Sequence, residues 1–424
     1  MIIRPFAAIR PREDVAAQVA ALPYDVYDRA EARHAVEGKP LSFLNIDRPE
    51  TQFAPDADMY APEVYAKARE LFDARLADGT FVREESPCFY LYELEMDGRV
   101  QTGIVACCLI DDYLNGTIKK HENTLEAKER DRINHIDALD AQTGPIFLAY
   151  RDNDQVTELV AQARTREPLY DFVADDGVAH RVWRIDARAD VEALAQAFAQ
   201  VPAAYVADGH HRTASAVKVG LARRAANPDF DGSEQFNGFL SVLFPASDLA
   251  ILPYNRVVHD LNGLTVDEFL ARIQEAFEVL HKQSQPLEPV DKGAVGMCLN
   301  GEWYGLGVLP EFESGDPVAG LDVSILQERV LGPVLGIDDP RTNPRIEFVG
   351  GIRGLHALEH RVMLADEAAR EAGTLEEQGP AVAFAMFPTS IEELLAVADA
   401  GLLMPPKSTW FEPKLRSGLF IHQI

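Results

Sequence analysis

The pattern of hydrophobic and polar positions along this chain predicts a mixture of helices and strands. Residues 58–77 place apolar side chains at helical spacing, whereas residues 88–96 and 99–110 are rich in β-branched and aromatic residues. The pair Asp97-Gly98 separates the last two runs and is typical of a β-hairpin. Further strands are expected at residues 145–151, 180–185 and 238–244, and further helices at residues 124–141 and 189–199.

The second half of the chain continues this mixture. We expect a strand at 249–255, an amphipathic helix at 265–279, a second hairpin around Gly301-Glu302, a helix at 322–335 and a last structured segment at 390–400. Strands outnumber clean β-α-β units, which favours an α+β (mixed α/β) fold over a doubly wound sheet. Because 424 residues exceed what one core usually serves, two domains are expected. They are an α+β domain over residues 1–258 and an α/β domain over residues 259–424, whose basic C-terminal segment packs back toward the functional site.

Charge narrows the choice of partners. The chain carries 40 Lys and Arg against 68 Asp and Glu, a formal net charge of -28. Such a surface repels nucleic acids and anionic membranes, but a local basic pocket can still hold a small anionic or phosphorylated metabolite. The chain has no apolar run of membrane-spanning length, no leader-like start and no C-x-x-C pair among its four cysteines, so we expect a cytoplasmic protein.

The strongest candidate for chemistry is the turn at residues 208–213. The run AAYVA predicts a strand that ends at Asp208, Gly209 permits a tight bend, and a helix is expected to begin at His210 or His211. Two imidazoles and a guanidinium in the first helical turn are unfavourable beside the partial positive charge of the helix, unless an anion binds there. We interpret the segment as a phosphate-binding turn, cradled by Gly209, with contacts from Arg212 and Thr213. The alternative is that Asp208 merely caps the helix and the histidines face solvent.

A second charged segment runs from Lys119 to Thr124. Glu122 is the candidate general base, because neighbouring cations could hold an anionic substrate beside it. Asp208, His210 and His211 are further catalytic candidates, and His121 and the downstream Arg132 are candidate substrate contacts. Thr124 is expected to cap the following helix. A solvated charged loop explains the same residues, and the local sequence leaves both interpretations open.

The C-terminal segment is locally basic. From residue 405 to the end, the chain has three cationic side chains and one carboxylate side chain, and three prolines stiffen it. Candidate phosphate contacts here are Lys407, Ser408, Thr409 and Lys414, and the alternative is a tail that only packs onto the body. Near the start, Asp25 follows a Pro-Tyr turn and is a candidate contact for a metal or a substrate amino group, or else a plain turn residue.

Several familiar signatures are missing from the sequence. It has no G-x-x-x-x-G-K-[ST] loop, no G-x-G-x-x-G after a strand, no H-E-x-x-H and no G-x-S-x-G. Nucleotide binding therefore requires another kind of fold. His210 and His211 point in different directions on a helix and are poor joint metal ligands.

Taken together, these segments resemble a family of bacterial and archaeal proteins known mainly as a domain of unknown function, DUF1015. The resemblance runs through LPYDVY, KKHENT with Arg130 and Arg132, ADGHHRTASA and MPPKSTWFEPKLRSGLF, and covers nearly the whole chain. The turn at 208–213 also resembles the phosphate-binding turn of the ParB/sulfiredoxin superfamily, whose sulfiredoxin version reads G-G-C-H-R. His210 stands where sulfiredoxin has its nucleophilic cysteine, which excludes thiol chemistry.

The second resemblance implies a ParB/sulfiredoxin-like element in the fold and phosphoryl transfer as the chemistry, since the superfamily includes free serine kinases. The first hypothesis is a phosphotransferase acting on a small hydroxyl metabolite, with serine as the leading acceptor and a nucleotide or pyrophosphate as the donor. Mg²⁺ would be held by Asp208 or Asp25, while Arg212, His211 and Lys407 neutralise charge. The second hypothesis is a non-catalytic nucleotide or phosphometabolite sensor with the same pocket. The acidic composition and the lack of a basic patch argue against a DNA-binding role.

Overall fold

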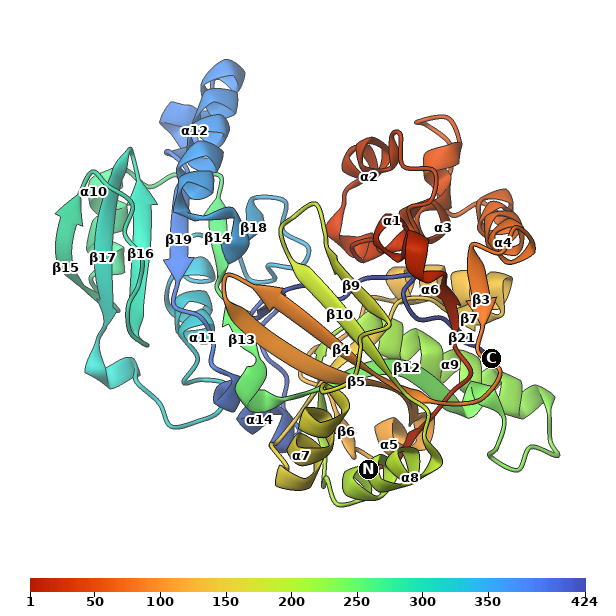
Figure 1. Ribbon diagram of the computed structural model, residues 1–424. Helices are drawn as coiled ribbons and strands as arrows, with labels where there is room; N and C mark the ends of the chain where they lie inside the picture. Colours follow the sequence, from red (N-terminus) through yellow and green to blue (C-terminus); the bar gives the residue numbers. More distant parts are fainter. The chain divides into compact units, whose positions relative to one another are not determined.

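The computed structural model describes residues 1–424 and divides into two compact units (Figure 1). The first unit contains Met1–Leu249 and Pro413–Ile424, and the second contains Ala250–Glu412. The expected division was 1–258 and 259–424. The structure instead assigns residues 250–258 to the second unit and the last segment to the first.

A nine-stranded mixed sheet organises the first unit. Its order is β6-β11-β8-β12-β5-β4-β10-β9, with β1 paired to β5. The strands are β1 (Ile3–Arg4), β4 (Phe89–Met96), β5 (Arg99–Leu109), β6 (Ile118–Lys119), β8 (Ile146–Tyr150), β9 (Tyr170–Val173), β10 (Ala179–Ile185), β11 (Ala204–Asp208) and β12 (Gly238–Pro245). The pairs β6–β11 and β8–β12 are parallel and the others antiparallel. β4 and β5 form the hairpin predicted around Asp97-Gly98, and the expected α+β character is confirmed.

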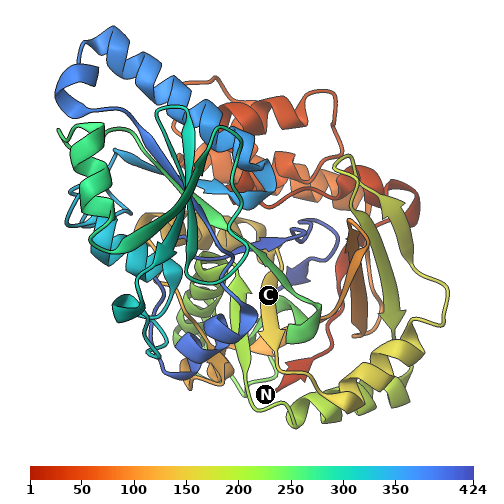
Figure 2. The same ribbon diagram turned by 90° about the vertical axis from the view of Figure 1, so that its left-hand side faces the viewer.

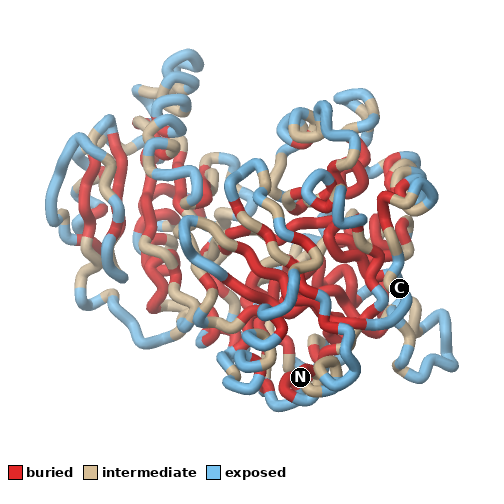
Figure 3. The backbone as a smooth tube through the Cα atoms, in the orientation of Figure 1, coloured by how far each residue is buried: buried red, intermediate tan, exposed pale blue.

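Helices pack around this sheet because its central strands are apolar along their length. All five residues of β8 are buried, and Figure 3 shows buried backbone along the central strands. One core cluster contains Ile146, Leu148 and Tyr150 of β8 together with Phe198 of α8 and Val217 of α9. A smaller core, which contains Phe43 and Phe72, packs among the N-terminal helices. The helices are α1 (Ala16–Val19), α2 (Arg29–Val36), α3 (Leu44–Asp47), α4 (Pro62–Ala77), α5 (Ile110–Leu114), α6 (Glu126–Leu139), α7 (Asp154–Ala163), α8 (Arg188–Ala199) and α9 (His210–Ala226).

Residues Pro413–Ile424 are part of the first unit, and their backbone pairs with distant residues there. β21 (His422–Gln423) pairs with β7 (Ala141–Gln142), and Ile421 bridges to Ile9 on β2 (Ile9–Pro11). β2 in turn pairs with β3 (Phe81–Arg83). Ser417 bridges to Ala21 just before the LPYDVY motif. These pairings hold the basic segment after Pro413 against the body of the first unit.

The second unit is built on a six-stranded antiparallel sheet in the order β15-β17-β16-β19-β14-β18. Helix α12 packs against β14, β16 and β19 (Figure 2). The elements are β13 (Ala250–Leu252), β14 (Tyr254–Val258), α10 (Val266–Ile273), β15 (Phe277–Gln283), β16 (Ala294–Leu299), β17 (Glu302–Val308), α11 (Asp322–Leu326), β18 (Ile346–Gly350), α12 (Leu355–Ala372), α13 (Leu375–Gln378), β19 (Val382–Met386), α14 (Ile391–Asp399) and β20 (Trp410–Glu412), which pairs with β13.

Three expected helices differ from those observed. The helix expected at 265–279 ends at Ile273, and residues from Phe277 form β15 instead. The helix expected at 322–335 is α-helical only over α11 and continues as a π-helical turn from Gln327. Helix α6 begins at Glu126 with Leu125 as its N-cap, so Thr124 is not the cap; its hydroxyl donates to the Glu129 carboxylate. None of the helices has both the length and the apolar character needed to cross a membrane.

Candidate functional site

The turn at residues 208–213 has the predicted backbone. β11 ends at Asp208, Gly209 adopts a φ of +95°, and α9 begins at His210. No side chain caps this helix, and its first turn contains no acidic residue. The fully buried hydroxyl of Thr213 donates to the Gly209 carbonyl at 3.0 Å, which stabilises the turn. The partial positive charge at the start of α9 is therefore not compensated by any side chain of the helix's first turn.

The Arg212 side chain packs against this turn, and the residue is 9% exposed. Its guanidinium donates to the Pro145 carbonyl, lies 3.9 Å from an Asp208 carboxylate oxygen, and leaves a buried Nε without a hydrogen-bond partner. Burial alone would lower the pKa of Arg212, but the carboxylates of Asp208 and Asp25 outweigh it and raise the pKa. Arg212 therefore stays charged, with donor capacity left over.

Asp208 joins the turn to the C-terminal segment. Lys414 Nζ donates to Asp208 Oδ2 at 3.1 Å. Burial would raise the pKa of Asp208, but the charges of Lys414 and Arg212 outweigh it and hold the pKa well below its usual range. Asp208 is thus an ionised carboxylate between two cations.

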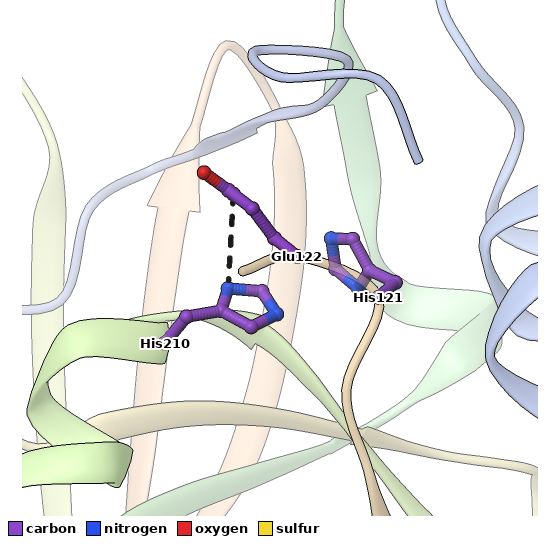
Figure 4. A group of neighbouring side chains, drawn as sticks. All are labelled: His121, Glu122 and His210. Carbon is purple, nitrogen blue, oxygen red and sulfur yellow. Dashed lines mark ion pairs between the residues drawn. The ribbon is translucent and has the colours of Figure 1, made fainter. Parts of the chain in front are cut away.

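The loop after β6 brings a second group of side chains to the start of α9 (Figure 4). His210 Nδ1 lies 3.9 Å from Glu122 Oε2, and the rings of His121 and His210 meet edge to face with centroids 4.5 Å apart. Both imidazoles are buried, whereas the Glu122 side chain is one-third exposed at 33%. These three residues come from two segments that were considered separately in the sequence.

Burial keeps both of these histidines neutral. It lowers the pKa of His121 to about 4, against a smaller opposing effect of Asp208. Burial also lowers the pKa of His210 well below its ordinary value, and the neighbouring His121 adds to the effect. At neutral pH each ring therefore has one unprotonated nitrogen.

The His211 side chain contacts the loop between β6 and α6 and holds it in place. Its Nε2 accepts a hydrogen bond from the Leu125 backbone N–H at 3.0 Å, so that nitrogen is unprotonated. Ser215, one turn along α9, donates to the backbone carbonyls of His211 and Glu129. These contacts tie the start of α6 to the start of α9.

Two neighbouring cavities lie beside Arg132 in the first unit. The smaller, about 30 Å³, is lined by Arg212, Asp47 and Thr143 among others. The larger, about 210 Å³, is lined by Asp25 and Lys128 among others. Both also touch Tyr24, Arg132 and His135, so they adjoin one another. Arg132 itself is held by two hydrogen bonds to Asp131 Oδ2, and its guanidinium stacks 3.8 Å from the centre of the Tyr24 ring.

The first unit therefore contains most of the residues singled out in the sequence. They are Asp25, His121, Glu122, Arg132, Asp208, Gly209, His210, His211, Arg212, Thr213 and Lys414. Lys407, Ser408 and Thr409 belong to the second unit, where Lys407 Nζ lies 5.5 Å from the centre of the Tyr254 ring and Ser408 Oγ donates to the Pro405 carbonyl. Their part in anion binding stays a prediction, as does that of Thr213.

Sequence reasoning missed several polar residues that line the cavities. Asp47 accepts a hydrogen bond from Thr143 at 2.9 Å, and both are buried. His135 Nε2 donates to the Ile46 carbonyl at 2.9 Å, and Ser417 lines the smaller cavity with them. Tyr24 and Ser417 lie in segments that the sequence analysis quoted, LPYDVY and MPPKSTWFEPKLRSGLF, but neither residue was singled out there. The others are ordinary residues of helices and strand ends that tertiary packing brings together.

Comparisons with known proteins found one matching family and several similar solved structures. A family model described as "Protein of unknown function (DUF1015)" matches residues 3–324. The search of curated proteins found no match. A solved structure titled "Free serine kinase in complex with AMP" shares 14% identity over 74% of this chain and 91% of that chain, with a TM-score of 0.31. SbnI from Staphylococcus aureus, with a C-terminal truncation, shares 12% over 74% and 85%, with a TM-score of 0.35. A conserved hypothetical protein from Pyrococcus furiosus shares 15% over 74% and 94%, with a TM-score of 0.33. Values this low assign neither a ligand nor an activity to this chain.

Proposed function

Given that the chain belongs to the DUF1015 family, whose description names no activity, we propose that it is a phosphotransferase acting on a small hydroxyl-bearing metabolite. A nucleotide or pyrophosphate is the donor. The observation that carries the proposal is the start of α9, where an uncapped helix end, the charged Arg212 and Lys414 meet around Asp208 in a chain of net charge -28.

This concentration of positive charge suits an anion. A helix start offers N–H groups that have no partner within the helix, and the helix dipole favours negative charge there. Arg212 has an Nε without a partner, and Lys414 approaches the same turn from the C-terminal segment. A phosphate bound here would meet backbone donors and fixed cations together. Phosphoryl transfer depends mainly on such positioning and charge neutralisation.

The acceptor fits the larger cavity. Its volume of about 210 Å³ suits a molecule the size of an amino acid, and Asp25, Lys128 and Arg132 provide charged groups around it. Serine is the first acceptor to test, because the segment Asp208–Thr213 resembles the phosphate-binding turn of the ParB/sulfiredoxin superfamily, which includes the free serine kinases. Glu122, one-third exposed beside His210, is the group proposed to take the hydroxyl proton.

Mg²⁺, when bound, would neutralise the donor phosphates. Asp25 suits it better than Asp208, because Asp25 is exposed and lines the larger cavity. Asp208 already lies between Lys414 and Arg212, and two neighbouring cations oppose the approach of a third. Asp25 would therefore be the protein's contribution to the ion, and Asp208 would position the two cations.

The test combines a binding screen with turnover. The full chain would be heated with AMP, ADP, ATP, pyrophosphate and phosphoserine, and a true ligand present at a hundred times its Kd should stabilise the protein by about 2.7 kcal/mol. Transfer would be followed as phosphoserine formed from serine and each donor with Mg²⁺, with homoserine and threonine as comparison acceptors. Binding without turnover of any hydroxyl compound would support the sensor alternative, and absence of both would reject the proposal.

A further inference from the structure

The cluster of His121, Glu122 and His210 has the composition of a transition-metal site, and we propose that it binds one divalent first-row transition-metal ion, with Zn²⁺ as the probe. One ligand atom from each residue lies within 4.8 Å of the other two. Two imidazole nitrogens and one carboxylate oxygen are the donors that zinc and its neighbours prefer. Mg²⁺ and Ca²⁺ prefer oxygen donors alone, so this site is distinct in kind from the Mg²⁺ contact proposed at Asp25.

The spacing is close to what coordination requires. Ligand atoms placed 2.0–2.2 Å from a tetrahedral ion lie about 3.4 Å from one another. His210 Nδ1 and Glu122 Oε2 are 3.9 Å apart, and no separation in the cluster exceeds 4.8 Å. Small rotations of the three side chains would bring them onto one ion without moving the backbone.

A second observation points to a ligand independently of this spacing. His121 Nδ1 and His210 Nε2 are buried and have no hydrogen-bond partner, in residues that are 2% and 7% exposed. A buried polar atom without a partner costs about 1–3 kcal/mol. Most buried polar groups in a folded protein have a partner, and two of the eleven buried side-chain atoms that lack one in this structure belong to this cluster. An ion bound at His121 Nδ1 would remove the cost at that atom. At His210 it would do so if Nε2 is the ligand atom, and not if Nδ1, which lies 3.9 Å from Glu122 Oε2, binds the ion.

The surroundings hold His121 in the orientation that metal ligation needs. The Val206 backbone carbonyl is within hydrogen-bonding reach of the His121 ring, and since Nδ1 has no partner, the nitrogen that reaches it is Nε2. A ligating imidazole usually donates its other N–H to a carbonyl or carboxylate in this way, which fixes the ring and leaves the ligating nitrogen unprotonated.

The backbone also holds the two segments together. β6 and β11 are parallel, with Lys119 opposite Tyr205, so the loop with His121 and the turn before His210 leave the sheet at the same end. The Leu125–His211 hydrogen bond closes the loop over the helix start. Three protein ligands leave a fourth position for water or an anion, as in catalytic zinc sites. A monodentate carboxylate binds through one oxygen, so Glu122 keeps a second oxygen for proton transfer.

The experiment measures metal binding without any nucleotide. The full chain would be stripped with a chelator, dialysed and titrated with Zn²⁺ by calorimetry, and with Co²⁺ by visible absorption. We expect one ion per chain. The Co²⁺ absorption should have the high intensity that is typical of four- or five-coordinate ions. His121→Ala and His210→Ala should each weaken binding by at least about 100-fold, because loss of a mere supporting contact already costs 10–100-fold. Glu122→Gln should weaken it less, since both imidazoles remain.

His211→Gln is the matched control, because His211 is the adjacent imidazole on the same helix but points to Leu125. It should bind the ion as the wild type does, and so should His34→Ala, which removes an exposed imidazole of α2. Should the unligated His210→Ala chain fail to fold by circular dichroism, His121→Gln in the loop decides. The inference is overturned if the stripped wild type takes up no ion, or if the His121 and His210 variants bind as tightly as His211→Gln. Neither result bears on phosphoryl transfer, which is assayed with Mg²⁺ and a donor.

Discussion

Lys414 Nζ lies 3.1 Å from Asp208 Oδ2, and this contact joins the C-terminal segment to the strand end before α9. Their side chains are 12% and 29% exposed, so the pair is largely shielded from solvent. Protonation of Asp208 would remove the negative charge that attracts both Lys414 and Arg212. Asp208 therefore organises the cations of the proposed anion site even if it never touches a substrate.

Replacing Lys414 with Met should destabilise the protein by about 1.5–3 kcal/mol at pH 7, the usual worth of a hydrogen bond to a charged group. The measurement is the free energy of unfolding in urea. Lys39→Met removes an exposed partner of Asp175, with side chains 55% and 88% exposed, and should cost less than about 1 kcal/mol. Equal losses in the two variants would show that the Lys414 contact is no stronger than a surface ion pair.

The same variant should change the pH dependence of stability. In the wild type the folded pKa of Asp208 lies below its unfolded value, so its contribution is present above the unfolded pKa and is lost as pH falls through the folded pKa. Without the charge of Lys414, the effect of burial on Asp208 is less opposed, and the pKa of Asp208 in the folded protein rises. The difference in unfolding free energy between wild type and Lys414→Met should therefore shrink as pH falls below about 4, the ordinary pKa of an aspartate. A difference that stays constant over this range would contradict the assignment.

Gly209 should resist substitution for two separable reasons. A Cβ at this position would sit at a φ of +95° and only 3.1 Å from Arg212 Cζ. Gly116 has a φ of +81° with nothing within 4 Å of the added atom, so Gly116→Ala measures the backbone cost alone, about 1–2 kcal/mol. Gly209→Ala should cost more than this and also weaken nucleotide or pyrophosphate binding, because it displaces Arg212. If Gly209→Ala and Gly116→Ala lose the same unfolding free energy, the contact with Arg212 does not contribute to the cost at Gly209.

The hairpin at Asp97-Gly98 and the strand–turn–helix at Asp208 to His210 were predictable because each is set by neighbouring residues. The helix expected at 265–279 was predicted too long, since Phe277 and Val279 fit a helical spacing and a strand alternation equally well. In the fold, pairing of β15 with β17 selects the strand. The start at Thr265 follows from a capping box with Glu268, which is again local.

The composition of the site was less predictable than its central turn. His121 and His210 were each singled out, but separately, because only the parallel pairing of β6 with β11 makes them neighbours. Adjacent histidines drew attention in the sequence, although the imidazole that meets His210 comes from another segment. Asp47 and Thr143 carried no signal, since their hydrogen bond depends on the packing of distant segments.

Buried histidines should make the protein less stable in mild acid. Burial lowers the pKa of His422 to about 4, against the opposing hydrogen bond to the Gln235 carbonyl. A lowered folded pKa means that stability is present above the unfolded value near 6.5 and is lost as pH falls toward the folded value. His422→Gln should reduce the slope of unfolding free energy between pH 6.5 and 4.5 by up to about 1.4 kcal/mol per pH unit. His34→Gln, on an exposed helix face, controls for the residue change, and an unaltered slope in His422→Gln would reject the prediction.

The roles of Glu122 and Arg212 can be separated by one pair of variants. Glu122→Gln should abolish phosphoryl transfer while leaving nucleotide or pyrophosphate binding nearly intact, because it removes a proton acceptor and keeps the size of the side chain. Arg212→Ala should instead weaken binding by roughly ten- to hundred-fold, the equivalent of a charge-assisted contact of about 1.5–3 kcal/mol. Binding measured by calorimetry and transfer measured as phosphorylated product distinguish the two effects. If Glu122→Gln transfers phosphate as fast as the wild type, Glu122 is not the base, and Asp25 beside the larger cavity becomes the next residue to test. If Arg212→Ala binds donor normally, Arg212 only supports the turn through Pro145 and Asp208, and the anion must lie elsewhere.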